Sequence, residues 1–292
     1  MRALDVAKAL FVILIWGSNF VVVKWGLQDF SPYLLLALRF AMIACFLVPF
    51  VKWPKGRFWP LFRYSMMLGV IHFGLMFSGM QHIDASTSAL LSQLNTPFAV
   101  ILSAFMFKDY PGWRRILGIS IAFAGCVVVG GQPRFDGNFI WVFSIVLAAF
   151  CWAYAATQAK RLGDLDPFTL NGWMAVMAAP CWFAISFLVE DNQVAMIMDA
   201  GWKGWGAAAF QAAFVTVTGY GIWYGLIKQY PLSRVIPFTL LLPVVGVAGG
   251  VLILDDALTI PMIIGGAMVV VGVGIVTIRQ AAKGSAPDAE VR

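Results

Sequence analysis

Long apolar stretches, separated by short polar segments, fill the chain almost from end to end. They are continuous, as in 66–79 and 246–254, and do not alternate between apolar and polar positions. A helix of about twenty apolar residues crosses the hydrocarbon core of a bilayer, whereas the strands of a membrane barrel alternate with a period of two. The pattern predicts ten transmembrane helices near 6–27, 32–51, 61–81, 85–107, 113–131, 138–159, 168–189, 205–228, 232–254 and 260–279.

Composition supports an all-α integral membrane protein. Hydrophobic residues make up 61% of the 292 residues and charged residues only 12%, whereas soluble domains are roughly half apolar and a quarter charged. The first apolar run continues through 16–23 without a small-residue cleavage site, so we expect it to be retained as a span and not removed as a signal peptide. The polar segment 281–292 is expected to be a disordered cytoplasmic tail.

The positive charges fall mainly on one side of the predicted topology. With ten spans, 16 of the 20 Lys and Arg residues lie on the side that carries both termini. Because cytoplasmic loops carry the excess of positive charge, both termini are predicted to be cytoplasmic, with the chain in a bacterial inner membrane. The net charge of +6 therefore reflects topology, and no nucleic-acid partner is expected.

The second half of the chain looks like a diverged copy of the first. Pro97 matches Pro243 at an offset of 146 positions, and Gly79 matches Gly225 at the same offset. After one inserted residue in the second copy, the offset is 147, and acid and glycine positions match as well. At this offset Asp109, Gly118 and Gly125 align with Asp256, Gly265 and Gly272. Chance agreement between two apolar sequences is the alternative, but the preserved order of prolines, glycines and acids argues against it.

Five spans in each copy make the repeat inverted. An odd number of spans forces the second copy to enter the membrane from the opposite side, as in transporters whose substrate site lies at the repeat interface. We therefore predict a first five-helix repeat at 1–133 and a second, inverted repeat at 134–280, followed by the tail at 281–292.

Polar side chains in the fourth and ninth predicted spans are candidates for binding a solute. Gln93 lies four residues before Pro97, and Thr239 lies four before Pro243, so the repeat places both at symmetric positions near the membrane midplane. A proline frees the carbonyl four residues earlier and bends the helix, which suits a cavity wall. The alternative is that these side chains only join neighbouring helices. Being uncharged, they suit a neutral or zwitterionic solute.

Aromatic residues mark the first, sixth and eighth spans. Trp16 and Asn19 share one face of a helix, and Trp152 is the repeat mate of Trp16, with Tyr154 two residues later. Trp and Tyr usually anchor helices at the membrane surface, but Trp16 and Trp152 lie near mid-span. They are either packing residues or walls of an aromatic cavity. The eighth span adds three further candidates, Thr218, Tyr220 and Trp223.

Two basic side chains also lie inside predicted spans. His72 is the repeat mate of Thr218, and a single histidine of this kind is more often structural than a proton carrier. Arg39 lies deep in the second span, where we expect it to pair with Asp29, Asp84 or a helix C-terminus. All 14 acidic residues fall in loops, tails or span ends. This distribution favours a facilitator or a potential-driven carrier, unless His72 relays protons.

Several motifs resemble the ten-helix EamA-type members of the drug/metabolite transporter superfamily, and within it bacterial amino-acid exporters of the YddG kind. The motifs are 16–24, 38–40, 219–223, 243–246 and 254–256. The resemblance covers about residues 5–280, although Asp109 and Asp256 stand where the family typically has Glu. It implies that helices 1, 3, 4, 6, 8 and 9 surround a central cavity, with 5 and 10 outside, and that small metabolites are exported by alternating access. In the related sugar-phosphate translocators the Gln93/Thr239 neighbourhood is basic.

The predicted function is export of amino acids and related small metabolites, with broad selectivity. The expected partners are a small-molecule substrate and the lipid bilayer, and the expected oligomeric state is a monomer, without a cofactor, a metal or a catalytic residue. A multi-pass membrane enzyme, a channel, and a carrier of other metabolites or drugs are the alternatives. An enzyme would need a catalytic constellation, and a channel more often has charged rings or a filter loop.

Overall fold

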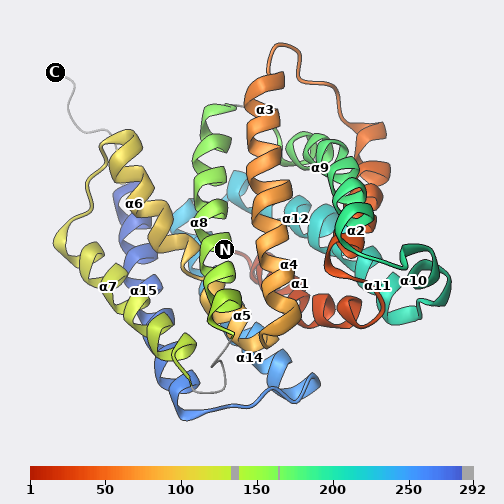
Figure 1. The fold of residues 1–292 in the computed structure, drawn as a ribbon. Coiled ribbons are helices and arrows are strands. Elements are labelled where there is room, and N and C mark those ends of the chain that lie inside the picture. The colour runs from red at the N-terminus through yellow and green to blue at the C-terminus, as the bar shows by residue number, and fades with distance from the viewer. Residues whose placement is uncertain (133–137, 164, 285–292) are drawn as a thin grey trace.

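The computed structural model describes residues 1–132, 138–163 and 165–284, and all regular elements in these ranges are helical (Figure 1). The first half contains α1 (Ala3–Asp29), α2 (Pro32–Leu47), the 3₁₀ turn η1 (Val48–Phe50), α3 (Phe58–Tyr64), the π-helix η2 (Ser65–His72), α4 (Phe73–His82), α5 (Ala85–Ser92), α6 (Asn95–Phe107) and α7 (Trp113–Gly130). Since α3, η2 and α4 are continuous, and α5 and α6 follow one another, these helices form five spans.

The second half repeats this order with one addition. It contains α8 (Phe139–Arg161), α9 (Pro167–Val189), α10 (Gln193–Asp199), α11 (Trp202–Phe210), the π-helix η4 (Gln211–Gly219), α12 (Tyr220–Gln229), α13 (Leu232–Val235), the 3₁₀ helix η5 (Ile236–Leu241), α14 (Leu242–Ile253) and α15 (Ile260–Gly284). The short helix α10 was not predicted. Its seven residues join the seventh and eighth spans, and they are too few to cross a membrane.

Within the described ranges, nine helical segments are long and apolar enough to cross a membrane. The remaining predicted span, the eighth, is the continuous helical segment Trp202–Gln229, formed by α11, η4 and α12. Its sequence is less apolar than the others because it carries several polar side chains, namely Gln211, Thr216, Thr218, Tyr220 and Tyr224. The chain is thus an all-helical membrane protein, with the spans near the predicted positions.

Two of the predicted domain boundaries lie close to residues that the structure does not describe. The boundary at 133/134 lies outside the described residues. The last helix α15 runs to Gly284, so residues 281–284, which were expected to belong to a disordered tail, are helical. An apolar helix that has already crossed the bilayer can continue beyond it, since each further residue adds a backbone hydrogen bond. The remaining residues of the expected tail, 285–292, lie outside the described part of the chain.

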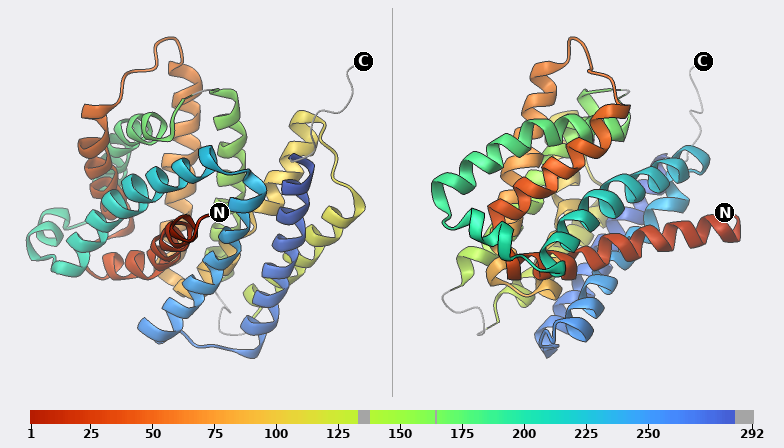
Figure 2. Two further views of the ribbon diagram at one scale, coloured as in Figure 1. Left: turned by 180° about the vertical axis from the view of Figure 1, so that it is seen from behind. Right: turned by 90° about the vertical axis from the view of Figure 1, so that its right-hand side faces the viewer.

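Packing between helices is symmetric under exchange of the two halves. Helix α1 packs against α14 and against the α11–η4 segment, while its counterpart α8 packs against α6 and against the η2–α4 segment. Helices α2 and α9 pack on each other at one side of the molecule, and α7 and α15 do so at the opposite side (Figures 1 and 2). These contacts of one repeat therefore have partner contacts in the other repeat.

The crossing of α7 and α15 shows this symmetry at atomic detail. A Cβ atom added to Gly118 would lie 2.8 Å from the carbonyl oxygen of Gly272, and one added to Gly125 would lie 2.6 Å from that of Gly265. Gly118 and Gly265 are repeat mates, as are Gly125 and Gly272, so the two contacts exchange with each other. The matched glycines thus allow the two backbones to approach closely at the interface between the repeats.

The proline-induced breaks are confirmed in both repeats. Pro97 has no N–H group for the carbonyl of Gln93, which instead accepts a 3.2 Å hydrogen bond from the N–H of Thr96. In the second repeat, the carbonyl of Thr239 accepts from the N–H of Leu242, the residue before Pro243. Each carbonyl is therefore satisfied by a tight 3₁₀-type turn, which interrupts the regular α-helical hydrogen bonding there.

The π-helices were not predicted, yet they also match. Segments η2 and η4 begin at residues 65 and 211, which differ by the repeat offset of 146. Each offers a carbonyl oxygen at an equivalent position to an indole N–H from another helix: Trp182 donates to Gly69 at 2.8 Å, and Trp16 donates to Val215 at 3.1 Å. Since π-helices are wider than α-helices and are frequent at functional sites, the two π-helices are candidates for part of the functional site.

Candidate functional site

The residues predicted to bind a solute lie on six of the spans. Helix α1 carries Trp16 and Asn19, η2 ends at His72, Gln93 follows α5, and α8 carries Trp152 and Tyr154. Segment η4 carries Thr218, α12 begins with Tyr220 and continues to Trp223, and η5 contains Thr239. Ring contacts connect three of them.

Trp16, Tyr220 and Trp223 form one aromatic cluster. The Trp16 ring centroid lies 5.3 Å from that of Tyr220 and 5.4 Å from that of Trp223, with interplanar angles of 53°. The indole N–H is held by the carbonyl of Val215, and the ring lies directly over Gly219, where a Cβ atom would collide with it. The predicted grouping of these three aromatics is therefore present in the structure, and Gly219 provides the space for it.

Asn19 lies one turn after Trp16 and has an unused acceptor. Its Oδ1 atom is buried and has no hydrogen-bond partner. A buried amide oxygen without a partner costs about 1–3 kcal/mol. A solute that donates a hydrogen bond at this position, such as an ammonium group, would remove that cost.

His72 connects the third span to the sixth. Its Nδ1 atom lies 2.8 Å from the carbonyl oxygen of Ala148 in α8. A carbonyl oxygen only accepts, so this nitrogen carries a proton and donates the hydrogen bond. The hydrogen bond supports the structural role that was favoured for this histidine.

Thr218, the repeat mate of His72, is used locally. Its hydroxyl group donates a 3.0 Å hydrogen bond to the carbonyl of Ala213, five residues earlier. This contact satisfies a carbonyl within the π-helix η4. The hydroxyl oxygen can still accept a hydrogen bond.

Gln93 and Thr239 lie at the two proline-induced breaks. Gln93 is buried, with 7% of its surface exposed, at the junction between α5 and α6. The hydroxyl group of Thr239 donates to the carbonyl of Ile236 at 2.7 Å. Their equivalent positions follow from the repeat, and their place near the membrane midplane remains a prediction.

Trp152 and Tyr154 occupy different faces of α8. Trp152 follows the fully buried Ile145 and Ala148 at helical spacing, and 37% of its own surface is exposed. Tyr154, two positions later, is rotated by about 200°, and the structure does not place it on the same face.

The expectation for Arg39 is wrong. In the described part of the chain no carboxylate forms an ion pair with it, and Asp29 instead accepts hydrogen bonds from the N–H groups of Gly201 and Gly204 at 3.1 and 2.8 Å. The carboxylate of Asp29 thus stabilises the start of α11. The guanidinium group of Arg39 lies over the Phe73 ring, at 4.2 Å from its centroid.

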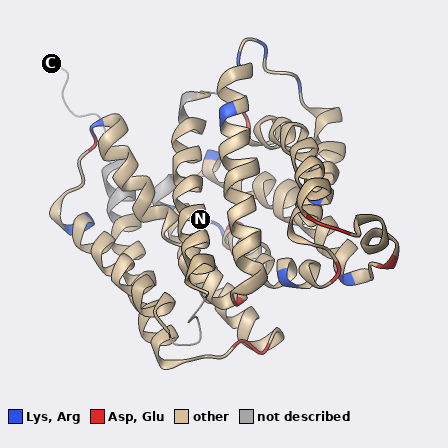
Figure 3. Ribbon diagram, in the orientation of Figure 1, with Lys and Arg blue, Asp and Glu red and all other residues tan. Residues whose placement is uncertain are grey.

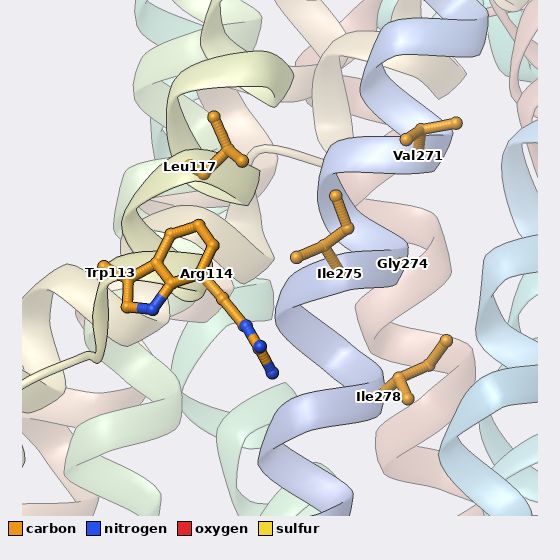
Figure 4. Close-up of a pocket in the computed structure, with 7 residues that line it drawn as sticks. All are labelled: Trp113, Arg114, Leu117, Val271, Gly274, Ile275 and Ile278. Carbon is orange, nitrogen blue, oxygen red and sulfur yellow. The ribbon is translucent and has the colours of Figure 1, made fainter.

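A separate groove lies between α7 and α15, away from these residues. Its volume is about 540 Å³, and its lining is apolar except for Arg114 (Figure 4). The lining residues are Trp113, Arg114, Leu117, Val271, Gly274, Ile275 and Ile278. Among the described residues, no group of three or more His, Cys, Asp or Glu side chains could hold a metal ion.

Comparison with known proteins gives one family over both halves of the chain. The profile of the EamA-like transporter family matches residues 6–131 and residues 139–278. A probable amino-acid metabolite efflux pump of Escherichia coli (strain K12) is 29% identical over 285 residues, covering 94% of this chain and 95% of that protein. The protein of the same name from Salmonella typhimurium is 30% identical over the same coverage.

More distant proteins agree with this assignment. An uncharacterized transporter of Archaeoglobus fulgidus is 25% identical over 266 residues, covering 89% of this chain and 94% of that protein. A crystal structure of 17% sequence identity aligns with a TM-score of 0.66, covering 98% of this chain and 100% of its own. At that identity the structural likeness shows a shared fold.

Proposed function

Because the chain belongs to the EamA-like transporter family, we propose that it exports amino acids and related small metabolites across a bacterial cytoplasmic membrane by alternating access. Two relatives of about 30% identity and nearly full coverage are named as probable amino-acid metabolite efflux pumps, which supports this substrate class. Membership of the family makes the protein a membrane transporter and not an enzyme.

The aromatic cluster of Trp16, Tyr220 and Trp223 carries the proposal. It joins α1 of the first repeat to α12 of the second, so it lies at the repeat interface, where inverted-repeat transporters bind their substrates. The unused Oδ1 of Asn19 and the uncharged side chain of Gln93 add polar groups without net charge. Such a lining suits zwitterionic amino acids with apolar side chains better than phosphorylated solutes.

Alternating access requires places where the spans can bend. The matched breaks at Pro97 and Pro243 and the matched π-helices η2 and η4 lie in the third, fourth, eighth and ninth spans. At these places the regular hydrogen-bond ladder is already interrupted, so bending there breaks few further bonds. These interruptions in one repeat correspond to those in the other. Bending first in one repeat and then in the other therefore gives two conformations that are related by the repeat symmetry.

The direction of insertion follows from charge. Lys and Arg occur in the loop before α3 and at the junction of α6 and α7, while Asp and Glu mark the region around α10 (Figure 3). The positive-inside rule then places the first region and both termini in the cytoplasm. We further propose a monomer that acts as a facilitator or a potential-driven carrier.

An efflux assay in cells tests the proposal. Cells that express the protein are loaded with dipeptides, which are hydrolysed inside, and the release of free amino acids is measured against cells with an empty vector. We expect faster release of several amino acids. Equal release in both strains for every amino acid, with the protein present in the membrane, would overturn the amino-acid assignment and leave other metabolites or drugs as the cargo.

A further inference from the structure

The second span contains a buried cation that is held by aromatic rings. Arg39 lies in α2 with only 5% of its surface exposed. Its Cζ atom is 4.2 Å from the Phe73 ring centroid, 5.4 Å from that of Phe40 and 5.8 Å from that of Phe77. Cation–π contacts of this kind hold the guanidinium plane in one orientation, but they use none of its N–H donors.

Two nitrogen donors of this guanidinium group have no hydrogen-bond acceptor. Its Nε and Nη1 atoms are buried and have no hydrogen-bond partner. Arginine stays protonated in proteins, and a charge inside a membrane span is costly unless it is paired. Neither the described acidic residues nor the carbonyl oxygens of the described helices satisfy these two nitrogens. Each of these two nitrogens shares one edge of the planar guanidinium group with Nη2, and a carboxylate binds along either edge through two parallel hydrogen bonds.

Arg39 also lies beside the aromatic cluster. The side chains of Tyr220 and His72 are both close enough to interact electrostatically with its guanidinium group. Tyr220 in turn packs on Trp16, and the His72 ring lies 4.8 Å from that of Phe73, the ring beneath Arg39. The unpaired donors thus belong to the same region of the protein as the proposed substrate site.

We propose that Arg39 binds the carboxylate of the transported solute. This inference rests on the proposed function and narrows it, because it makes a carboxylate the required group and the rest of the solute variable. The carboxylate would accept hydrogen bonds along one edge of the guanidinium group, which includes one of the orphan donors, and would neutralise the buried charge. The rings of Trp16 and Trp223 would then contact the solute's side chain, which fits broad selectivity among amino acids.

Competition in proteoliposomes tests the role of Arg39. Counterflow of labelled L-phenylalanine is measured with three competitors. They are phenylalanine itself, 3-phenylpropionate, which keeps the carboxylate but lacks the ammonium group, and phenylalaninamide, which lacks the carboxylate. In the wild type we expect the amide to compete at least about tenfold more weakly than the two carboxylates. Arg39→Lys retains the charge without the two-pronged geometry, so it should keep part of the flux, and Arg39→Met should lose it. Arg63→Met, which removes an exposed arginine from α3, should behave like the wild type.

A binding measurement separates this inference from the proposed function. The thermal stability of purified protein is measured with 3-phenylpropionate or with its neutral amide. Stabilisation of the wild type by the acid alone, lost in Arg39→Met, is the expected result even if no amino acid is transported. Equal effects of acid and amide on the wild type, or an unchanged preference for the acid in a folded Arg39→Met protein, would overturn the role of Arg39. Absence of counterflow for every amino acid would overturn only the amino-acid assignment.

Discussion

The indole N–H of Trp16 in α1 donates a 3.1 Å hydrogen bond to the backbone carbonyl of Val215 in the π-helix η4. The contact joins the first span of one repeat to the eighth span of the other. It exists because the π-helix leaves this carbonyl available and because Gly219, one turn later, has no side chain to occupy the place of the indole ring.

A side chain at Gly219 should displace Trp16. In Gly219→Val the new Cβ would overlap the indole ring, so Trp16 must leave Tyr220 and Trp223. We expect amino-acid export to fall several-fold, while the amount of folded protein is retained, and we expect the same of Trp16→Ala, which removes the indole ring itself. Gly225→Val is the matched control, because a Cβ at Gly225 in the same helix meets no atom within 4 Å. Similar export by both variants would remove the cluster from the site.

Loss of the Gln93 amide should affect transport more than folding. Gln93→Leu keeps the approximate volume and leaves intact the backbone hydrogen bond between Thr96 and Gln93 that closes the turn. We therefore expect lower flux with an unchanged melting temperature. Ser120→Ala removes an exposed hydroxyl group that bonds within α7 and should leave both quantities unchanged. A Gln93→Leu protein with wild-type flux would assign this side chain to helix packing.

The crossing of α7 and α15 should tolerate no added volume. Gly125→Leu would force the helix away from the carbonyl of Gly265, which lies 2.6 Å from the added Cβ position. Overpacking of this kind costs about 1–3 kcal/mol, so the unfolding temperature in detergent should fall. Gly112→Leu, placed where a Cβ meets nothing within 4 Å, should not lower it. An equal melting temperature for Gly125→Leu and the wild type would contradict the close approach of the two helices.

Labelling of introduced cysteines from one side of the membrane tests the predicted topology. Asn192 and Lys55 are both exposed, but the charge distribution places Asn192 outside the cell and Lys55 in the cytoplasm. In a background whose native cysteines have been replaced, Asn192→Cys should react with a membrane-impermeant maleimide in intact cells. Lys55→Cys should react only after the cells are opened. The reverse pattern would contradict the predicted orientation of the protein in the membrane.

The sequence predicted the spans well because length and apolarity follow directly from the bilayer. Prolines at matched positions also predicted the breaks after Gln93 and Thr239. The π-helices could not be foreseen, since an added backbone residue per turn leaves no signature in apolar periodicity. Arg39 was misjudged because its partner was sought at Asp29, Asp84 or a helix C-terminus, whereas Asp29 is already engaged by the start of α11. Only tertiary structure shows which donors remain unpaired.

Counterflow in proteoliposomes tests the central claim most directly. Purified protein is reconstituted into vesicles loaded with unlabelled amino acids, and the entry of a panel of labelled amino acids is followed. The account predicts saturable uptake that is accelerated by unlabelled amino acid on the opposite side, since one site is exposed alternately to each side. Uptake that rises linearly with concentration and ignores the opposite side would contradict alternating access, and no uptake of any amino acid would contradict the proposed cargo.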